Sequence, residues 1–305
     1  MTPLALLGVL SSAIFSGASL LYATLGEIVG ERSGIVNLGL EGVLLVGAAS
    51  GFAATYVTGS PYLGVLAAML AGGLMNMILG YLVVTRRANQ LASGLALMFF
   101  GFGLSAWIGR AYVGAKIVGL PRLSLPGLAG LPVVYASLLR FDPLIYLALP
   151  AAGLVWWLLF RTRWGLGLRA VGENPDTAYA SGRSPQRIRY HALLAAGALA
   201  GLGAAHLSIA YTMNWTEYMT GGRGFIAIAL VIFSKWHPLR AIVGALLFSG
   251  AVAFQLLLQA SGIQVSPFLL NTLPYLLTLL VLIAWGGSRR QAAPASLGRV
   301  YQGTE

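Results

Sequence analysis

The chain has 305 residues, of which 58% are apolar and 9% are charged, with a net charge of +11 and a mean hydropathy of +0.81. Soluble domains carry about 25% charged residues, so the composition excludes an ordinary soluble enzyme and indicates an integral membrane protein. The basic residues lie between long apolar runs, which argues against a nucleic-acid partner, and the absence of cysteine excludes disulfides, thiolate metal sites and a cysteine nucleophile.

Eight apolar stretches are long enough, or nearly long enough, to cross a membrane. About 20 apolar residues are needed to cross about 30 Å of hydrocarbon as a helix. We expect the first stretch to be a retained span rather than a signal peptide, because no basic residue precedes it and no cleavage-type site stands out. In chain order the stretches are Leu4–Leu25, Gly34–Val57, Pro61–Thr85, Leu91–Gly109, Pro143–Phe160, Tyr190–Tyr211, Ala241–Gln259 and Pro267–Gly286.

A ninth apolar segment, Phe225–Ser234, is too short to span alone. If it crosses, 14 basic residues lie inside and 5 outside, whereas 9 lie inside and 10 outside if it turns back. The positive-inside rule therefore favours about nine crossings. A segment this short completes its crossing either as a tilted helix in locally thin membrane, or with Gly221–Gly224 entering the membrane as irregular backbone, which is tolerated beside a cavity or inside protein.

The longest basic loop, residues 161–189, has the punctuation of a helix. Asn174 is a typical N-cap, Pro175 suits the first helical position, and Asp176 in the first turn favours the helix dipole. Gly182 is placed to end this helix after about two turns. Because so short a helix is marginal in water by itself, we expect it to dock on its own inner face or on a partner. Attraction of the arginines to anionic lipid explains the charge of the loop, but not the capped helix.

Glu41 is the one charged residue well inside a predicted span, about 10 Å beyond its start at Gly34. An ionised carboxylate near a helix centre costs about 2.5–3.5 kcal/mol, so it should face protein or water. Glu41 and Asn37 either satisfy each other and a neighbouring helix, or lie in a broken-helix region beside a solute path. Glu27 and Glu31 are expected to have structural roles.

Further polar residues lie at membrane depth. Gln255 and Gln259 share a helix face and either line a pore or, as is commoner, join helices. Ser93 and Asn271 also lie within predicted spans.

Four motifs, in order along nearly the whole chain, resemble the permease subunits of ATP-binding-cassette (ABC) importers. Within that group they resemble the branched-chain-amino-acid and simple-sugar permease class, and more narrowly the nucleoside-type permeases served by basic membrane lipoproteins. The motifs are GEIVGERSGIVNLGLEGVLLVGA at residues 26–48, LASGLAL at 91–97, WGLGLRAVGENPDTAYASG at 164–182 and GGRGFIAIALVIFSKWHPLRA at 221–241.

The resemblance implies an all-α type II importer permease of about nine membrane segments, with 225–234 short or broken, in the bacterial cytoplasmic membrane. It implies a coupling helix, here Asn174–Ser181, that seats on a separate ATPase subunit. The residues then expected at the ATPase are Glu173, Asn174, Pro175, Asp176, Ala178, Gly182, Arg183 and Arg187. Those expected along the solute path are Asn37, Glu41, Ser93 and Asn271.

The resemblance also implies three protein partners besides membrane lipid: the ATPase, a second and non-identical permease, and an extracytoplasmic solute-binding lipoprotein. The solute would be a nucleoside or a related small polar molecule, with simple sugars or branched-chain amino acids as alternatives, and no cofactor is expected. Similar permeases often carry asparagine where this chain has Met98. Either this subunit contributes less to selectivity, with the partner supplying the polar group, or its solute differs.

We expect residues 1–288 to form a single transmembrane domain and residues 289–305 to form a disordered, basic cytoplasmic tail. Two other classes of function remain open. One is a secondary transporter or channel that needs no ATPase, against which only one acidic residue lies well inside a span. The other is a membrane enzyme, against which the three histidines are scattered and neither HExxH nor GxSxG occurs.

Overall fold

The computed structural model describes residues 3–123, 140–260 and 293–300, together with residues 272, 276, 279, 280 and 283. Two helices end in a π-helical turn, at residues 81–85 and 206–211, and one ends in a 3-10 turn at 110–112. The helices are α1 (Pro3–Arg32), α2 (Leu40–Thr58), α3 (Pro61–Gly80), α4 (Gln90–Gly109), α6 (Pro143–Arg161), α7 (Arg163–Glu173), α8 (Pro175–Ala180), α9 (Pro185–Ala205), α10 (Arg223–Phe233) and α11 (Pro238–Ala260).

Seven helices in the described part are long and apolar enough to span a membrane: α1, α2, α3, α4, α6, α9 and α11. They correspond to the first seven predicted stretches, and the eighth, Pro267–Gly286, falls almost wholly outside the described residues. The helix α10 is too short to be counted among them.

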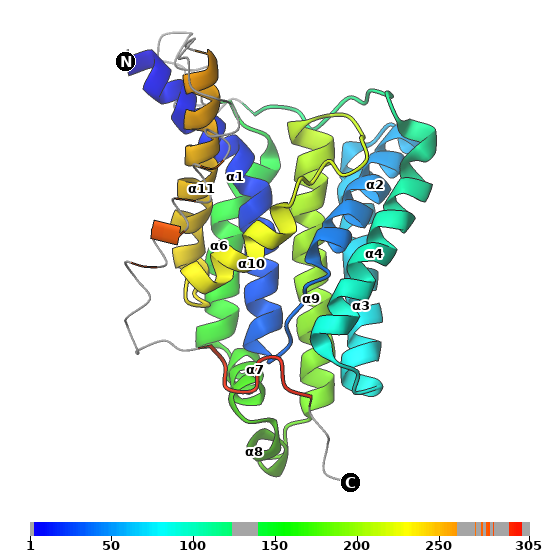
Figure 1. Cartoon of the computed structure of the whole chain (residues 1–305), viewed down its shortest axis with the longest axis vertical. Helices are drawn as coiled ribbons and strands as arrows, with labels where there is room; N and C mark the ends of the chain where they lie inside the picture. Colours follow the sequence, from blue (N-terminus) through cyan, green and yellow to red (C-terminus); the bar gives the residue numbers. More distant parts are fainter. Residues whose placement is uncertain are drawn as a thin grey trace.

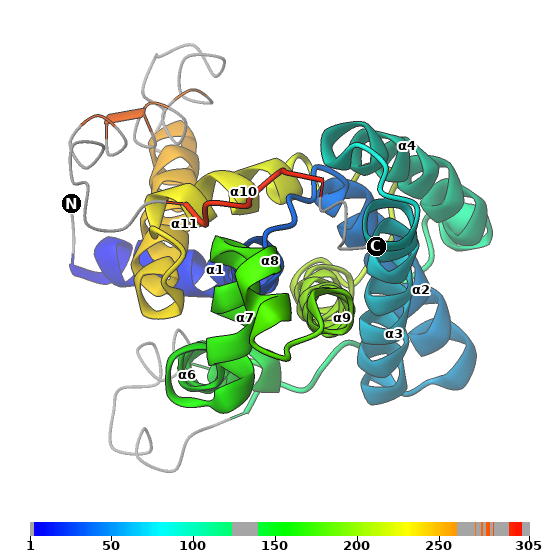
Figure 2. The same ribbon diagram turned by 90° about the horizontal axis from the view of Figure 1, so that it is seen from below.

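The helices form a bundle organised around α1 and α9. These two helices pack against each other, and α1 also packs against α6, α10 and α11, while α9 packs against α2 and α3. Seen along the bundle, α2, α3 and α4 group on one side of α9, while α1 lies on the other side with α6 and α11 flanking it (Figure 2). Two hydrophobic clusters result, one around α1, α6 and α11 and one around α2.

Small residues set the close approach of α3 and α9. A Cβ atom added to Gly197 would lie 2.3 Å from the carbonyl oxygen of Gly72, and one added to Gly201 would lie 2.2 Å from that of Ala68. Lipid tails are as apolar as leucine, so membrane helices associate by such van der Waals packing rather than by the hydrophobic effect. These glycines therefore allow the backbones to meet directly.

Two segments of irregular backbone interrupt the bundle. The first, residues 33–39, joins α1 to α2, so that α2 begins at Leu40 rather than at the predicted Gly34. The prediction that Glu41 lies deep in a helix is therefore wrong: it lies in the first turn of α2. The start is delayed because the Asn37 side chain accepts a hydrogen bond from the Gly39 N–H and holds a turn there.

The second irregular segment, residues 212–222, leads into α10. Gly221 and Gly222 have φ angles of 55° and 83°, a left-handed conformation that glycine adopts readily. The fully buried Trp215 anchors the segment inside the protein. Gly221 and Gly222 thus have irregular backbone, whereas Arg223 and Gly224 already belong to α10, which sits at mid-height in the bundle (Figure 1). That this segment completes a membrane crossing stays a prediction.

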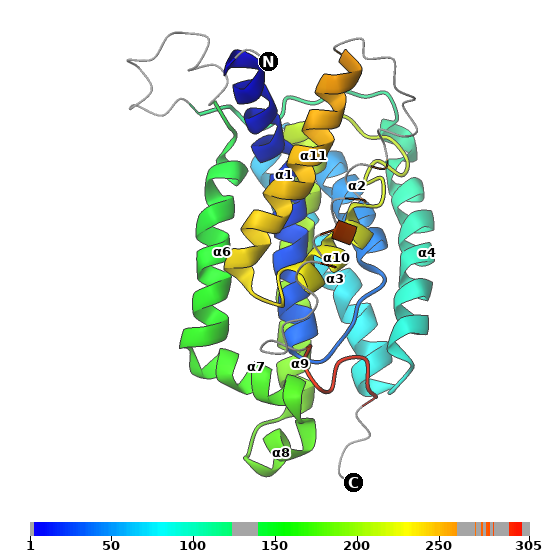
Figure 3. The same cartoon turned by 60° about the vertical axis from the view of Figure 1, so that its left-hand side comes forward.

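The helices α7 and α8 project from one end of the bundle, which we call the α8 end (Figure 3). The predicted cap is confirmed, because the Asn174 side chain accepts hydrogen bonds of 3.0 Å from the N–H groups of Asp176 and Thr177. Gly182, with φ of 77°, follows the end of α8. The sequence reasoning missed α7.

We predict that Gly197→Ala lowers the thermal unfolding midpoint of the detergent-purified protein by several degrees. Overpacking of this kind costs about 1–3 kcal/mol. The matched control is Gly103→Ala on α4, where an added Cβ meets nothing within 4 Å. Both changes bring the same gain in helix propensity, so equal midpoints for the two variants would contradict a tight α3–α9 contact.

Candidate functional site

The two irregular segments are joined where α2 and α10 begin. One carboxylate oxygen of Glu41 accepts hydrogen bonds from the Thr220 hydroxyl and, at 2.8 Å, from the Gly222 N–H. The other accepts one from the Gly224 N–H at 2.6 Å. A negative charge at a helix N-terminus satisfies N–H groups that have no partner within the helix. Glu41, from another helix, therefore caps α10.

Close packing accompanies this cap. A Cβ atom on Gly224 would lie 2.5 Å from the backbone nitrogen of Glu41, so only glycine fits there. A Cβ atom on Gly42 would lie 2.8 Å from the carbonyl oxygen of Met98 on α4. Met98, the position where similar permeases often carry asparagine, thus lies against the first turn of α2. We call the meeting point of residues 33–42 with 220–224 the crossing.

Within the crossing, Asn37 makes three hydrogen bonds through its backbone N–H and its side chain. Its backbone N–H donates to Glu27, its side-chain amide donates to Asn76 at 3.0 Å, and its side-chain oxygen accepts from Gly39. Asn76 in turn donates to the carbonyl oxygen of Leu193 on α9. This chain of bonds ties the first irregular segment to α1, α3 and α9.

The predicted path residues are thus brought only partly together. Asn37 and Glu41 both belong to the crossing and are buried, with their polar atoms hydrogen-bonded inside the protein. Ser93 is buried on α4, next to Gly94, whose backbone packs against Leu38. Asn271 lies outside the described residues.

Glu27 and Glu31 make contacts that suit the structural roles expected of them. Glu27 accepts the Asn37 N–H, and Glu31 accepts the indole N–H of Trp236. Arg32 donates to the carbonyl oxygen of Trp236 at 3.1 Å. The end of α10 and the end of α1 are therefore joined, which places the turn between α10 and α11 beside the C-terminus of α1.

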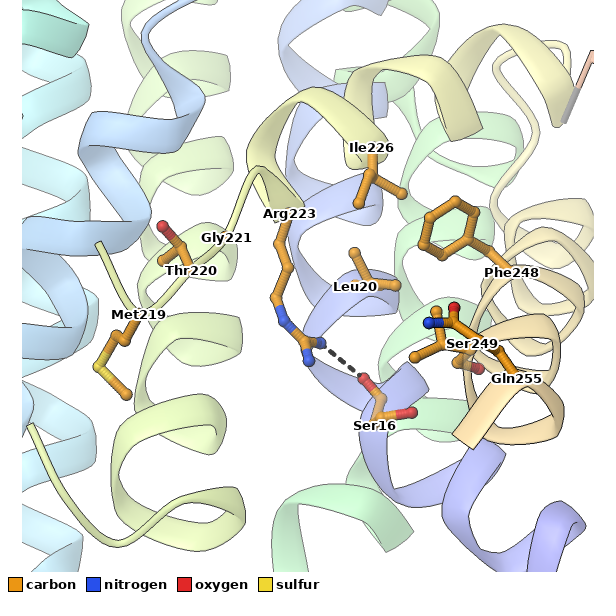
Figure 4. A pocket seen from close by; sticks show the side chains of 11 residues that line it. Ser16, Leu20, Met219, Thr220, Gly221, Arg223, Ile226, Phe248, Ser249 and Gln255 are labelled. Atoms are coloured by element: carbon orange, nitrogen blue, oxygen red, sulfur yellow. Dashed lines mark hydrogen bonds between the residues drawn. The ribbon is translucent and has the colours of Figure 1, made fainter. Parts of the chain in front are cut away.

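A cavity of about 440 Å³ opens beside the crossing, between α1, α10 and α11. Figure 4 shows Arg223 reaching from the start of α10 toward Ser16 on α1, with Ile226 on the same helix and Phe248 opposite them on α11. The sequence reasoning did not single out Arg223 as a site residue. One feature of the sequence could have pointed to Arg223: it is a charged residue just before an apolar segment that is too short to span the membrane alone.

At the α8 end, Pro175 is half-buried, and five of the eight residues expected to meet an ATPase are exposed, namely Glu173, Asn174, Asp176, Gly182 and Arg187. Arg183 is half-buried and donates to the carbonyl oxygen of Arg163. Ala178 is buried at 3% exposure and faces the protein rather than an outside surface. The large side chain of Tyr179, which was not among the eight, is exposed.

Residues 293–300, which we call the C-terminal segment, pack across the α8 end. The Ser296 hydroxyl donates to the carbonyl oxygens of Gly172 and Val171 in α7, at 2.7 and 3.2 Å. The Gly298 N–H donates to the carbonyl oxygen of Gly34, at 3.3 Å. The sequence predicts disorder over 289–305, whereas this part of the tail connects α7 directly to the first irregular segment.

Gln90 strengthens that connection. Its side-chain amide donates to the carbonyl oxygens of Gly34 and Arg299, and its side-chain oxygen accepts the Val36 N–H at 2.8 Å. Gln90 is buried at the start of α4. The C-terminal segment, α4 and the first irregular segment therefore share one hydrogen-bonded junction, which periodicity in the sequence does not reveal.

The family model for the permease component of branched-chain amino acid transport systems matches residues 9–285. The chain belongs to this permease family. The resemblance inferred from the four motifs is thereby confirmed. Because seven helices of the described residues are long and apolar enough to span a membrane, the permease is a multi-pass protein of the cytoplasmic membrane.

Curated relatives match the permease over nearly its whole length. The putative glucose ABC transporter permease protein TsgC13 of Haloferax volcanii is 36% identical over 96% of this chain and 97% of its own. The guanosine ABC transporter permease protein NupQ of Bacillus subtilis is 31% identical over 96% of both chains. The nucleoside ABC transporter permease protein NupC of Lactococcus lactis is 30% identical, also over 96% of both.

Bacillus subtilis also has a more distant relative, the guanosine ABC transporter permease protein NupP, 26% identical over 72% of this chain and 65% of its own. No solved structure matches the permease. In the described ranges, no three histidine or acidic side chains come together that could hold a metal ion.

We predict that Glu41→Gln destabilises the permease by about 1–3 kcal/mol, the cost of leaving a buried donor without its acceptor. The amide group of glutamine cannot accept the N–H that one carboxylate oxygen now accepts. Thermal unfolding of the purified protein measures the loss. Glu217→Gln, at an exposed position in residues 212–222, is the control, and equal unfolding midpoints for the two variants would show that Glu41 does not hold the crossing together.

Proposed function

We propose that this chain is the transmembrane permease subunit of an ATP-driven ABC importer for a nucleoside or a related uncharged polar solute. Its relatives are ABC permeases for nucleosides, guanosine and glucose. The structural observation that carries the proposal is α8, a capped helix of six residues that projects beyond the bundle. A helix so short gains stability by docking on a partner.

The ATPase subunit is proposed to dock on α8 at the cytoplasmic side. The exposed residues Asn174, Asp176 and Tyr179 offer it polar and aromatic contacts, with Glu173, Pro175, Gly182 and Arg187 at the edge. Two residues hold α8 on the rest of the protein. Ala178 is the buried residue of α8 itself, and Arg183, just after α8, donates a hydrogen bond to the carbonyl oxygen of Arg163. ATP hydrolysis belongs to that partner, and the permease itself performs no covalent chemistry.

Motion of α8 is proposed to reach the crossing through the C-terminal segment. The path runs from α8 through α7 to Ser296, then from Gly298 to Gly34 and along the first irregular segment to Glu41. Every step is a covalent link or a hydrogen bond in the described residues. The Glu41 cap then carries the displacement to α10, which borders the cavity.

Three further partners complete the proposal. The second permease is non-identical, as supported by the pair NupQ and NupP in Bacillus subtilis. An extracytoplasmic binding lipoprotein delivers the solute to the side opposite α8. Membrane lipid contacts the exposed apolar faces, for example Leu66, Leu70 and Leu74 on α3.

The other two classes of function are less well supported. Membership of a permease family that forms part of a transport system favours transport over membrane-bound catalysis. A secondary transporter would leave the exposed α8 without a partner. Residues 1–288 are proposed to act as one transmembrane domain.

We predict that inserting two glycines after Asp176 abolishes ATP-dependent uptake while the protein remains in the membrane. The insertion breaks the helical turn capped by Asn174, so that motion of the ATPase is no longer transmitted. Uptake is measured in proteoliposomes that hold the complete transporter. The control is the same insertion between Gly59 and Ser60, in the turn between α2 and α3, and unchanged uptake in the Asp176 variant would remove α8 as the coupling element.

We predict that Ser296→Ala lowers the amount of solute imported per ATP hydrolysed severalfold, with little loss of ATP hydrolysis. The change removes the hydroxyl that bonds the C-terminal segment to α7. Uptake and phosphate release are measured on the same proteoliposomes, with Ser60→Ala as control. If import per ATP equals that of the wild type, the C-terminal segment does not transmit the motion.

A further inference from the structure

The guanidinium of Arg223 is only half used by the protein. Its Nη1 donates to the carbonyl oxygen of Ser16 at 3.1 Å and to the hydroxyl of Ser19 at 2.9 Å. Over the ranges that the structure describes, its Nε–H and its two Nη2–H groups have no hydrogen-bond partner. Arginine carries five N–H donors in a fixed planar fork, so one whole edge of that fork is left to interact with something else.

No carboxylate in the described part of the chain forms an ion pair with Arg223. Seven of the eight acidic residues lie in the described part of the chain, the exception being Glu305. The ion pair found there joins His206 and Asp142, and the Glu41 oxygens bind residues 220, 222 and 224 instead. An arginine at membrane depth is costly unless it faces protein partners or a polar cavity. Arg223 faces the cavity of about 440 Å³ that it lines.

The size and lining of this cavity describe the ligand it fits. Small-molecule pockets have volumes of about 300–1,000 Å³ and are mostly apolar, with a few placed polar groups. Here Leu20, Ile226 and Phe248 provide apolar walls, and Arg223 provides the donor fork. The other polar side chains of the lining are Ser16, Thr220, Ser249 and Gln255. A hexose has hydroxyl groups on all sides that would each need a partner. A flat heterocycle with one acceptor edge suits the lining better.

We propose that the cavity holds the base of a 6-oxopurine nucleoside, with Nε–H and Nη2–H of Arg223 donating to its two adjacent acceptors, O6 and N7. Arginine makes this bidentate contact with guanine in nucleic acids. The inference rests on the proposed function, since it names the solute that the importer carries. Adenosine presents an amino donor in place of O6 and cannot accept both hydrogen bonds. Glu41 forms no ion pair with Arg223 but accepts the N–H groups of Gly222 and Gly224, the residues on either side of it. A negative charge this close to Arg223 suits an uncharged solute.

The natural absence of cysteine makes a direct test possible. Met219 lines the cavity and is half-buried, so Met219→Cys introduces a single reactive thiol there. The complete transporter carrying this variant is reconstituted in proteoliposomes and treated with a water-soluble thiol reagent, and labelling is read on this subunit after the subunits are separated. Inosine, guanosine, adenosine and glucose are compared as protecting solutes. Thr58→Cys, at the exposed last residue of α2, is the control thiol.

Inosine and guanosine are expected to protect Met219→Cys at concentrations about tenfold lower than adenosine, and glucose to protect least. No solute should protect Thr58→Cys. The Arg223→Lys change, added to Met219→Cys, keeps the charge but loses the planar fork. The concentrations at which inosine and adenosine protect the thiol should then lie within about twofold of each other. Arg110→Lys, at an exposed position, should leave the tenfold ratio in place.

Solute uptake by the same proteoliposomes tests the importer function separately from the proposed ligand of the cavity. ATP-driven uptake of any of the four solutes keeps the importer assignment, and the absence of ATP-driven uptake of every solute overturns it. Equal protection by inosine and adenosine, or no protection by a solute that is taken up, overturns the assignment of the cavity while leaving the importer in place. If the Arg223→Lys variant does not assemble into the transporter, the ratio of protecting concentrations of adenosine and inosine, measured with Arg223 intact, still tests the proposed ligand of the cavity.

Discussion

The arrangement of the whole bundle depends on one carboxylate at the crossing. In hydrocarbon, an unsatisfied backbone N–H costs several kcal/mol, and α10 begins at mid-height in the bundle. Glu41 supplies the acceptors that the first N–H groups of α10 require. In return, those N–H groups stabilise a charge that is expensive in the membrane. Neither irregular segment would be tolerated there without the other.

This mutual dependence explains why glycine, rather than polar side chains, surrounds the crossing. Glu41 reaches the α10 backbone only because Gly224 has no Cβ. Asn37 and Gln90 then fix the first irregular segment through backbone groups. The result is a site with rigid backbone geometry next to a cavity bordered by Arg223. The proposed tasks of positioning and recognition thereby fall to different side chains that are close in space.

The sequence predicted the elements that depend on local chemistry, and missed those that depend on distant contacts. The Asn174 cap and the apolar spans follow from neighbouring residues, and the structure agrees with both. The start of α2 was predicted wrongly. The apolar pattern of the sequence continues through Gly34 to Gly39, but side chains from α1 and α3 hold that segment in turns. The packing of Ser296 on α7 was likewise missed, since its partners lie more than a hundred residues away. Arg223 was passed over because a charge beside an apolar run resembles an ordinary boundary residue.

The position of the C-terminal segment has a consequence for biogenesis. Residues 293–300 are translated after every helix that they contact, yet they help to close the junction formed by Gly34, Gln90 and α7. During synthesis, the early helices must therefore enter the bilayer with this junction still open. The hydrogen-bonded connection from α7 to the crossing is therefore completed only after residues 293–300 have been made, and the proposed coupling cannot operate in a nascent chain before that point.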